Sequence, residues 1–115
     1  MMERRLWLSG LVFVCMLAPI EGARAQILIA ANPDCGRWIN ARRDNSANSY
    51  EWYLRGTLNG LALGADKEFW EAGGIRISGD QADAWMDKWC RENPLSKVLD
   101  GAKSLFLSRA VPARR

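Results

Sequence analysis

Apolar residues recur every three or four positions in two stretches of this 115-residue chain. Such spacing places them on one side of an α-helix. The first stretch, residues 47–65, ends near Gly64 and Asp66, and the second begins with Pro94, which suits the first turn of a helix. Both stretches therefore predict helices with one buried face. Their apolar members are Tyr50, Leu54, Leu58, Leu61 and Ala65, followed by Leu95, Val98, Leu99, Ala102, Leu105 and Phe106.

Capping signals mark two further helices. Asn32-Pro33-Asp34 precedes a short helix predicted over residues 35–43, and Asp44-Asn45-Ser46 ends it. Ser78 or Asp80 caps a helix that stops at Asn93-Pro94, because a residue before proline is pushed out of helical geometry. This helix carries the apolar stripe Ala82, Trp85, Met86, Trp89 and Cys90.

The remaining segments lack a helical stripe. Residues 66–79 include Gly73-Gly74 and the alternation of Ile75 and Ile77, which favours an extended piece. Residues 111–115 are predicted as a flexible tail. The predicted fold class is all-α: a small four-helix domain, orthogonal or bundle-like, over residues 26–110.

The first 25 residues have the three parts of an export signal in order. Arg4 and Arg5 give a positive start, residues 6–18 form an apolar run, and Ala23-Arg24-Ala25 supplies small residues at the cleavage positions. The run is shorter than the roughly 18 residues of a membrane span, so no stable membrane anchor is expected. We predict cleavage after Ala25, which removes Cys15 and leaves a periplasmic or secreted domain.

Two cysteines, Cys35 and Cys90, follow the predicted cleavage site. In an oxidising compartment, an even pair of thiols is most simply one disulfide. This bond would tie the start of the first predicted helix to the end of the third. Closing a loop across 55 positions contributes roughly 4 kcal/mol on the chain-entropy model, a large share of a small domain's stability.

The chain contains no histidine, which is the commonest general base and a frequent metal ligand. Nucleophile systems that pair serine or cysteine with histidine are excluded, and two cysteines alone are too few for zinc. Cleavage would reduce 16 basic and 13 acidic residues to 13 and 11, a net charge of +2. That balance argues against nucleic acid as a partner. We predict no enzyme activity, no catalytic residues, no metal and no cofactor.

Three carboxylates share one face of the third predicted helix: Asp80, Asp83 and Asp87. This spacing leaves carboxylate chemistry open. A solvated acidic face near a helix N-terminus explains it better, because the helix dipole favours negative charge there.

Glycine recurs every four residues in the second predicted helix, at Gly56, Gly60 and Gly64. Each glycine costs about 1 kcal/mol relative to alanine in a helix interior. We favour packing of the chain's own third or fourth helix on this ridge, with Trp85 or Trp89 lying across it. The other interpretation is a self-association face, which would make the protein a homodimer.

Five tryptophans remain after the predicted cleavage. An aromatic core explains Trp38, Trp85 and Trp89, because each ring buries a large area. Phe69 and Trp70 differ, since charged residues flank them in the irregular segment. We therefore name Phe69 and Trp70 as candidates for contact with a protein partner.

The chain from Cys35 to about Phe106 resembles two groups of small exported bacterial proteins. The order of Asp34-Cys35, Gly74-Ile75 and Trp89-Cys90 resembles the HdeA family of periplasmic acid-stress chaperones. Leu54-Arg55-Gly56-x-x-x-Gly60, followed by the helices from Trp85 to Leu105, is similar to the Rap/Tai type of immunity protein. The tryptophan-rich third helix departs from the chaperone pattern.

These resemblances imply two functions for a periplasmic module that binds a protein partner or client. The chaperone resemblance implies a stress role in which protonation of carboxylates loosens the fold and exposes apolar surface. The immunity resemblance implies a dimer that captures a secreted cell-wall amidase.

Overall fold

The computed structural model describes residues 27–115. The predicted signal segment and the cleavage after Ala25 lie outside the described residues. Within residues 27–115 the chain is mostly helical, as predicted, with α1 (Cys35–Arg43), α2 (Asn48–Ala65), α3 (Gly79–Glu92) and α4 (Val98–Arg109). A 3₁₀ helix, η1 (Ala72–Gly74), and two short strands, β1 (Lys67–Glu68) and β2 (Val111–Pro112), lie in the same part of the chain.

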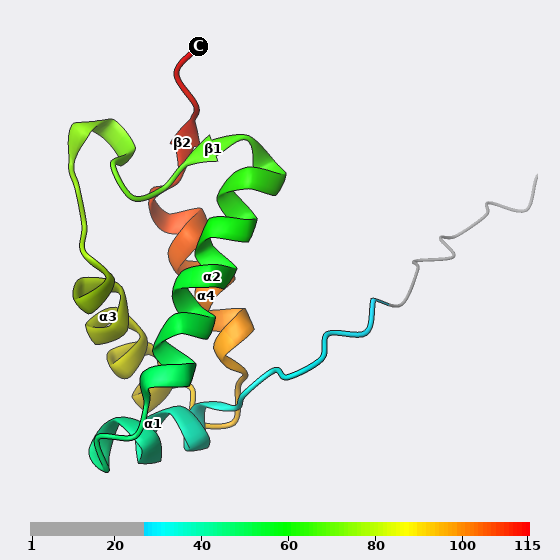
Figure 1. Cartoon of the computed structure of the whole chain (residues 1–115), viewed down its shortest axis with the longest axis vertical. Helices are drawn as coiled ribbons and strands as arrows, with labels where there is room; N and C mark the ends of the chain where they lie inside the picture. Colours follow the sequence, from blue (N-terminus) through cyan, green and yellow to red (C-terminus); the bar gives the residue numbers. More distant parts are fainter. Residues whose placement is uncertain (1–26) are drawn as a thin grey trace, which may run out of the picture.

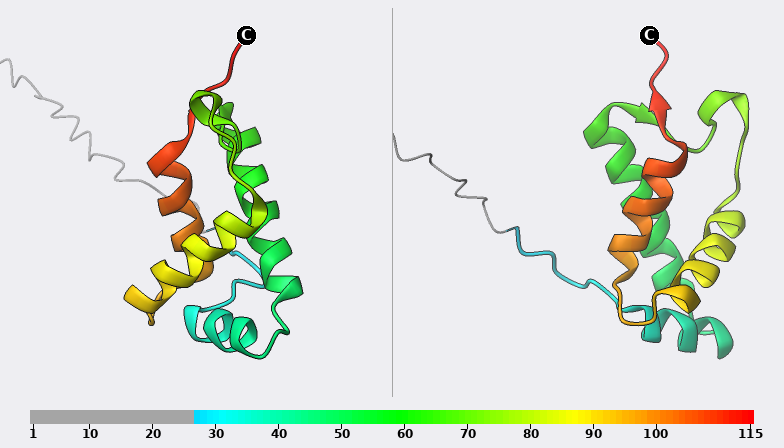
Figure 2. Two further views of the ribbon diagram at one scale, coloured as in Figure 1. Left: turned by 90° about the vertical axis from the view of Figure 1, so that its left-hand side faces the viewer. Right: turned by 180° about the vertical axis from the view of Figure 1, so that it is seen from behind.

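The 18-residue helix α2 lies at the centre of the domain (Figure 1). It packs most extensively against α4 and also against α3. The short helix α1 lies across the lower ends of α2 and α3 (Figures 1 and 2). Since α3 packs against α1, α2 and α4, it connects the small helix to the rest of the domain.

Local capping fixes where α1 and α3 begin. The Asp34 side chain accepts a hydrogen bond of 2.8 Å from the backbone N–H of Arg37 at the start of α1. The Ser78 hydroxyl oxygen accepts a hydrogen bond from the backbone N–H of Gln81, and the Gln81 side-chain oxygen accepts one from the backbone N–H of Ser78, which completes a capping box. These contacts satisfy N–H groups that have no partner inside a helix.

Helix α4 begins four residues later than predicted. Its first residue is Val98, whereas Pro94 and Leu95 lie in a turn outside the helix, and Leu95 is 97% exposed. Two backbone hydrogen bonds of 2.9 Å, from Cys35 to Ser96 and from Val98 to Pro33, join this turn to the chain before α1. Pairing with that distant segment therefore replaces the first predicted turn of the helix.

The C-terminal segment is also more ordered than predicted. Val111 and Pro112 form β2, which pairs antiparallel with Glu68 and Lys67 of β1. Next to this pair, the backbone N–H of Ala113 donates to the carbonyl oxygen of Asp66. The prediction of a flexible tail over residues 111–115 is therefore wrong for its first three residues.

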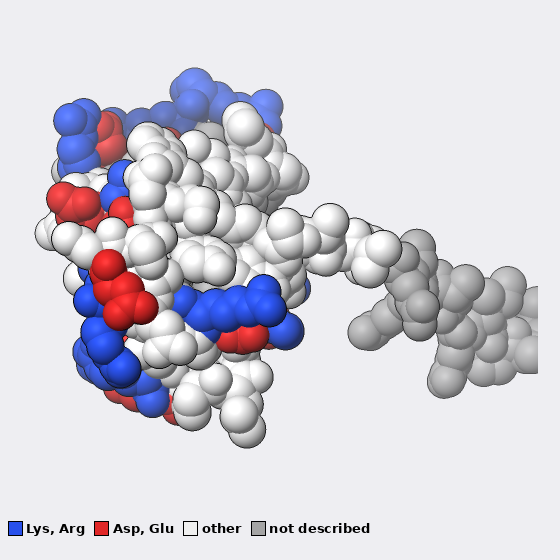
Figure 3. Space-filling model, turned by 60° about the horizontal axis from the view of Figure 1, so that its bottom comes forward, with Lys and Arg blue, Asp and Glu red and all other residues white. Residues whose placement is uncertain are grey.

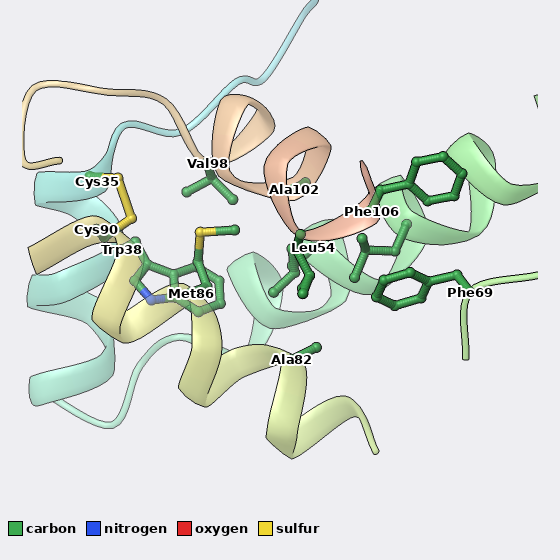
Figure 4. Close-up of a cluster of buried hydrophobic side chains, with 12 residues drawn as sticks. Cys35, Trp38, Leu54, Phe69, Ala82, Met86, Cys90, Val98, Ala102 and Phe106 are labelled. Atoms are coloured by element: carbon green, nitrogen blue, oxygen red, sulfur yellow. A yellow bond between two sulfur atoms is a disulfide. The ribbon is translucent and has the colours of Figure 1, made fainter. Parts of the chain in front are cut away.

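The core extends from the disulfide at one end to Phe69 at the other (Figure 4). Cys35 and Cys90 form the predicted disulfide, with their Cα atoms 5.0 Å apart. At the opposite end, Phe69 stacks on Phe106 with ring centroids 6.0 Å apart. The buried side chains between them come from all four helices: Trp38, Leu54, Leu58, Ala82, Met86, Val98, Ala102 and Leu105.

Replacement of both Cys35 and Cys90 by alanine is expected to lower the free energy of unfolding by roughly 4 kcal/mol, because the unfolded chain regains the freedom of a 55-residue loop. Urea unfolding followed by tryptophan fluorescence measures this change. An unchanged unfolding midpoint would show that the disulfide is not needed to hold α1 against α3.

Gly101 lets α3 and α4 approach closely. A Cβ atom at this position would lie 2.6 Å from Trp89 and 2.7 Å from the sulfur of Met86. Gly79 is similarly crowded by the side chain of Arg55. In contrast, a Cβ atom at Gly56 would have no neighbouring atom within 4 Å.

The substitutions Gly101→Ala and Gly56→Ala are therefore expected to have opposite effects. Gly101→Ala should lower the free energy of unfolding by about 1–3 kcal/mol through overpacking. Gly56→Ala should raise it by about 1 kcal/mol, because alanine favours the helix and meets no obstacle. Urea unfolding of the two variants tests this, and destabilisation by Gly56→Ala would contradict the open surroundings of that residue.

Candidate functional site

The outer side of α2 is an exposed surface without a charged residue. We call it the α2 face; its members are Ser49, Trp52, Tyr53, Gly56, Asn59, Gly60, Leu63 and Gly64. Trp52 is 62% exposed and Leu63 is 84% exposed. They lie opposite Leu54 and Leu58, which are completely buried. An apolar exposed patch on a small protein commonly marks a contact site.

The two charged residues of α2 both turn toward the neighbouring helices. Glu51 accepts a 2.8 Å hydrogen bond from the guanidinium of Arg42 on α1. Arg55 donates a 2.7 Å hydrogen bond to Asp83 on α3 and a longer one, 3.3 Å, to Asp80. Because both charges are paired inside the domain, the α2 face remains uncharged.

Figure 3 shows this distribution on one side of the molecule. A broad area without charged side chains extends toward the arm that precedes α1, which consists of residues 27–34. Basic and acidic groups gather around this area. Beside the N-terminal half of α2, a pocket of about 280 Å³ joins the α2 face to the arm. It is lined by Ala31, Asn32, Pro33, Arg37, Ser49, Tyr50 and Tyr53.

Arg55 links the α2 face to the interior. Its guanidinium lies 5.2 Å from the centre of the Trp52 ring, a cation–π contact, while it donates a hydrogen bond to Asp83. Asp83 is only 1% exposed. Burial raises the pKa of Asp83 above its ordinary value, and the hydrogen bond from Arg55 opposes that rise.

A second ion-pair cluster joins α1, α2 and α3. Asp87 accepts two hydrogen bonds from Arg42, of 2.9 and 2.8 Å, and a third of 2.8 Å from the indole N–H of Trp38. The hydrogen bonds to Asp87 raise the pKa of Arg42, so this guanidinium stays charged. The expectation of a solvated acidic face is therefore wrong for Asp83 and Asp87, which serve as partners for the half-buried arginines Arg55 and Arg42; of the three carboxylates, only Asp80 is exposed as expected.

The structure contradicts part of the predicted partner contact at Phe69 and Trp70. Phe69 is 1% exposed and belongs to the core. Trp70 is half-buried, and its indole N–H donates a 2.7 Å hydrogen bond to the side chain of Asn59. A buried Phe69 is not available to a partner, whereas contact through the remaining exposed part of Trp70 stays a prediction.

The glycine ridge lies on the exposed α2 face. In the described part of the chain, no atom outside the adjoining turns of α2 lies within 4 Å of a Cβ placed on Gly56, Gly60 or Gly64. Packing of α3 or α4 on this ridge, the interpretation favoured from the sequence, is therefore wrong. Trp85 and Trp89 instead stack on each other, with ring centroids 6.4 Å apart. Self-association through the ridge stays a prediction.

Trp52 and Leu63 were not identified from the sequence as site residues. Their positions carried a usable signal, because they share a helix face with the three glycines and lie opposite the apolar stripe. Within residues 27–115, no group of three potential metal ligands gathers, and no helix has the length and hydrophobicity of a membrane span. No protein-family model, curated protein or solved structure matches the chain.

Asp83→Asn is expected to flatten the pH dependence of stability. Because the pKa of Asp83 is raised in the fold, the folded state binds more protons than the unfolded state between that pKa and the ordinary value of about 4. The free energy of unfolding of the wild type should therefore receive a contribution that increases as the pH falls through this range.

Urea unfolding at several pH values from neutral down to about pH 4 measures that contribution. Asp44→Asn is the matched control, because Asp44 is exposed and its side chain has no ion pair in the described part of the chain. Identical pH profiles for Asp83→Asn and the wild type would contradict the effect assigned to burial.

Proposed function

We propose that this chain is a non-enzymatic protein-binding module of the periplasm or cell exterior. The observation that supports this proposal is the α2 face, an uncharged helix surface from which Trp52 and Leu63 project. Tryptophan is enriched among the residues that dominate binding energy. The centres of protein interfaces are also depleted of charged residues.

Binding at the α2 face removes apolar area from water without removing a charge from water. Burial of apolar surface contributes roughly 25 cal/mol per Å², whereas an unpaired buried charge is strongly unfavourable. The side chains of Glu51 and Arg55 are paired with α1 and α3 beside the face. An apolar segment of another protein is therefore the partner chemistry that fits this surface.

The surface is formed before any partner arrives. Arg55 contacts the ring of Trp52 and is itself held by Asp83. The disulfide fixes α1 to α3, and α3 packs against α2. A preorganised surface loses less conformational entropy on binding than a mobile one. The disulfide also supports an oxidising compartment, since such bonds are rare in the cytosol.

These features support a chaperone role that needs no acid trigger. The resemblance to the acid-stress family implies that protonation of carboxylates loosens the fold. Asp83 acts in the opposite direction, because a carboxyl group with a raised pKa stabilises the fold as the pH falls. We propose that the α2 face holds apolar segments of unfolding proteins already at neutral pH.

The preformed face also favours a second candidate, an immunity protein that captures one secreted cell-wall amidase. Both candidates use the same surface. They differ in the breadth of their partners: a chaperone accepts many unfolded chains, whereas an immunity protein binds one folded effector.

Leu63→Ser is expected to raise the amount of protein needed to suppress aggregation by about 10-fold. Burial of a leucine contributes about 1.5–3 kcal/mol, and 1.4 kcal/mol corresponds to a factor of ten in affinity. The measurement is light scattering at pH 7 from a reporter protein diluted out of guanidinium chloride.

Leu107→Ser is the matched control, because Leu107 is an exposed helical leucine of α4 outside the α2 face. It should suppress aggregation as well as the wild type. Equal loss in both variants would contradict the assignment to the α2 face. A wild type that suppresses no aggregation but binds a single amidase would favour the immunity candidate.

A further inference from the structure

The α2 face has the arrangement that a two-fold symmetric contact requires. Trp52 and Leu63 stand at its two ends, eleven positions apart, which is about 16 Å along a helix. Gly56 and Gly60 lie between them. The midpoint of Trp52 and Leu63 falls within one residue of the midpoint of Gly56 and Gly60. A two-fold axis at that point exchanges the two ends of the face.

We propose that a second copy of this chain docks on the α2 face, with the two α2 helices antiparallel. Trp52 then packs on Leu63 of the partner subunit, and Leu63 packs on Trp52 of the partner subunit. Symmetric dimers need such a self-complementary patch. If one residue of the first subunit contacts a second residue of the partner, the same two residues also make contact with the subunits exchanged. The inference rests on the proposed function, because it assigns an occupant to the same surface.

The glycines give the two helices room to approach. Among residues 27–115, apart from the adjoining part of α2 itself, no atom lies within 4 Å of a Cβ at Gly56, Gly60 or Gly64. Small residues let two helix backbones come close together, while large side chains at both ends meet each other. At the centre of the contact, Gly56 and Gly60 of the two subunits face each other. At each end, Trp52 of one subunit packs on Leu63 of the other.

The charge distribution fits a second copy as well. A two-fold symmetric contact brings two identical copies of one surface together. A charged residue near the symmetry axis would therefore lie beside the same charge on the partner subunit. The α2 face has no charged residue, since Glu51 and Arg55 are paired with α1 and α3. Self-docking therefore encounters no repulsion at its centre.

The contact area indicates a dimer that dissociates readily. A standard interface buries about 800 Å² on each partner. A helix with its side chains is about 10–12 Å wide, so the paired stretch covers a footprint of roughly 200 Å². This is small even when the relief of the surface is included. We therefore expect a weak, transient dimer, and a client and the second copy compete for the face.

A charge-rescue experiment tests both the occupant and its orientation. Leu63→Glu and Trp52→Lys should each weaken dimerisation more than 10-fold in light scattering across a concentration series. Mixing the two variants should restore a dimer, because Lys at position 52 then faces Glu at position 63 and the other contact stays native. Leu107→Glu is the control and should dimerise as the wild type does. Circular dichroism confirms that each variant is folded.

The inference would be overturned by a wild type that stays monomeric up to millimolar concentration, by a dimer unaffected by both variants, or by a mixture that remains monomeric. A monomer with Trp52 shielded from acrylamide would place the chain's own arm on the face and would also overturn it.

A monomeric wild type whose chaperone activity still depends on Leu63 leaves the proposed function intact. A rescued dimer whose chaperone activity ignores Leu63 refutes that function alone.

Discussion

The inward pairing of the two charges of α2 determines the character of its outer surface. Arg55 reaches Asp83, which is almost completely buried, and Glu51 binds Arg42, which in turn holds Asp87. A buried charge is tolerated when it is paired and hydrogen-bonded, and removal of one partner is strongly destabilising. These contacts therefore fix the rotation of α2 about its own axis. With that rotation fixed, the uncharged side that carries Trp52 and Leu63 has to face solvent.

The disulfide and the ion pairs act on the same helix, α3. Cys90 ties the end of α3 to α1, while Asp83 and Asp87 tie its middle to α2 and α1. Gly79 and Gly101 supply the space that these contacts need, since a Cβ at either would collide with a side chain. Helix α3 thus combines polar connections to α1 and α2 with close packing against α2 and α4. The position of α3, together with that of α4, therefore sets which residues of α2 are left uncovered.

The parts of the fold that depend on local chemistry were predictable from the sequence. The bounds of α1 and the Ser78 cap of α3 follow from residues adjacent to them. The start of α4 depends on a backbone hydrogen bond to Pro33, and the strand at Val111 depends on pairing with Glu68; no local pattern contains either contact. The site was harder to predict, because an acidic helix face has the same spacing whether water or arginine lies opposite. For Asp83, only the position of α3 next to Arg55 decides that the carboxylate pairs with arginine and does not face water.

Glycine has two distinct physical uses in this domain. At Gly79 and Gly101 a neighbouring side chain fills the space that a Cβ atom would take. The cost of each glycine in helix stability is therefore offset by packing within the chain. At Gly56, Gly60 and Gly64 the same cost, about 1 kcal/mol each relative to alanine, has no internal compensation, because the surrounding space is empty. A flat, uncharged ridge between two projecting apolar residues gains a physical role only when another backbone comes close to it. That requirement favours a helix or an extended chain as the occupant over a bulky folded surface, and a second α2 meets it with the same residues on both sides.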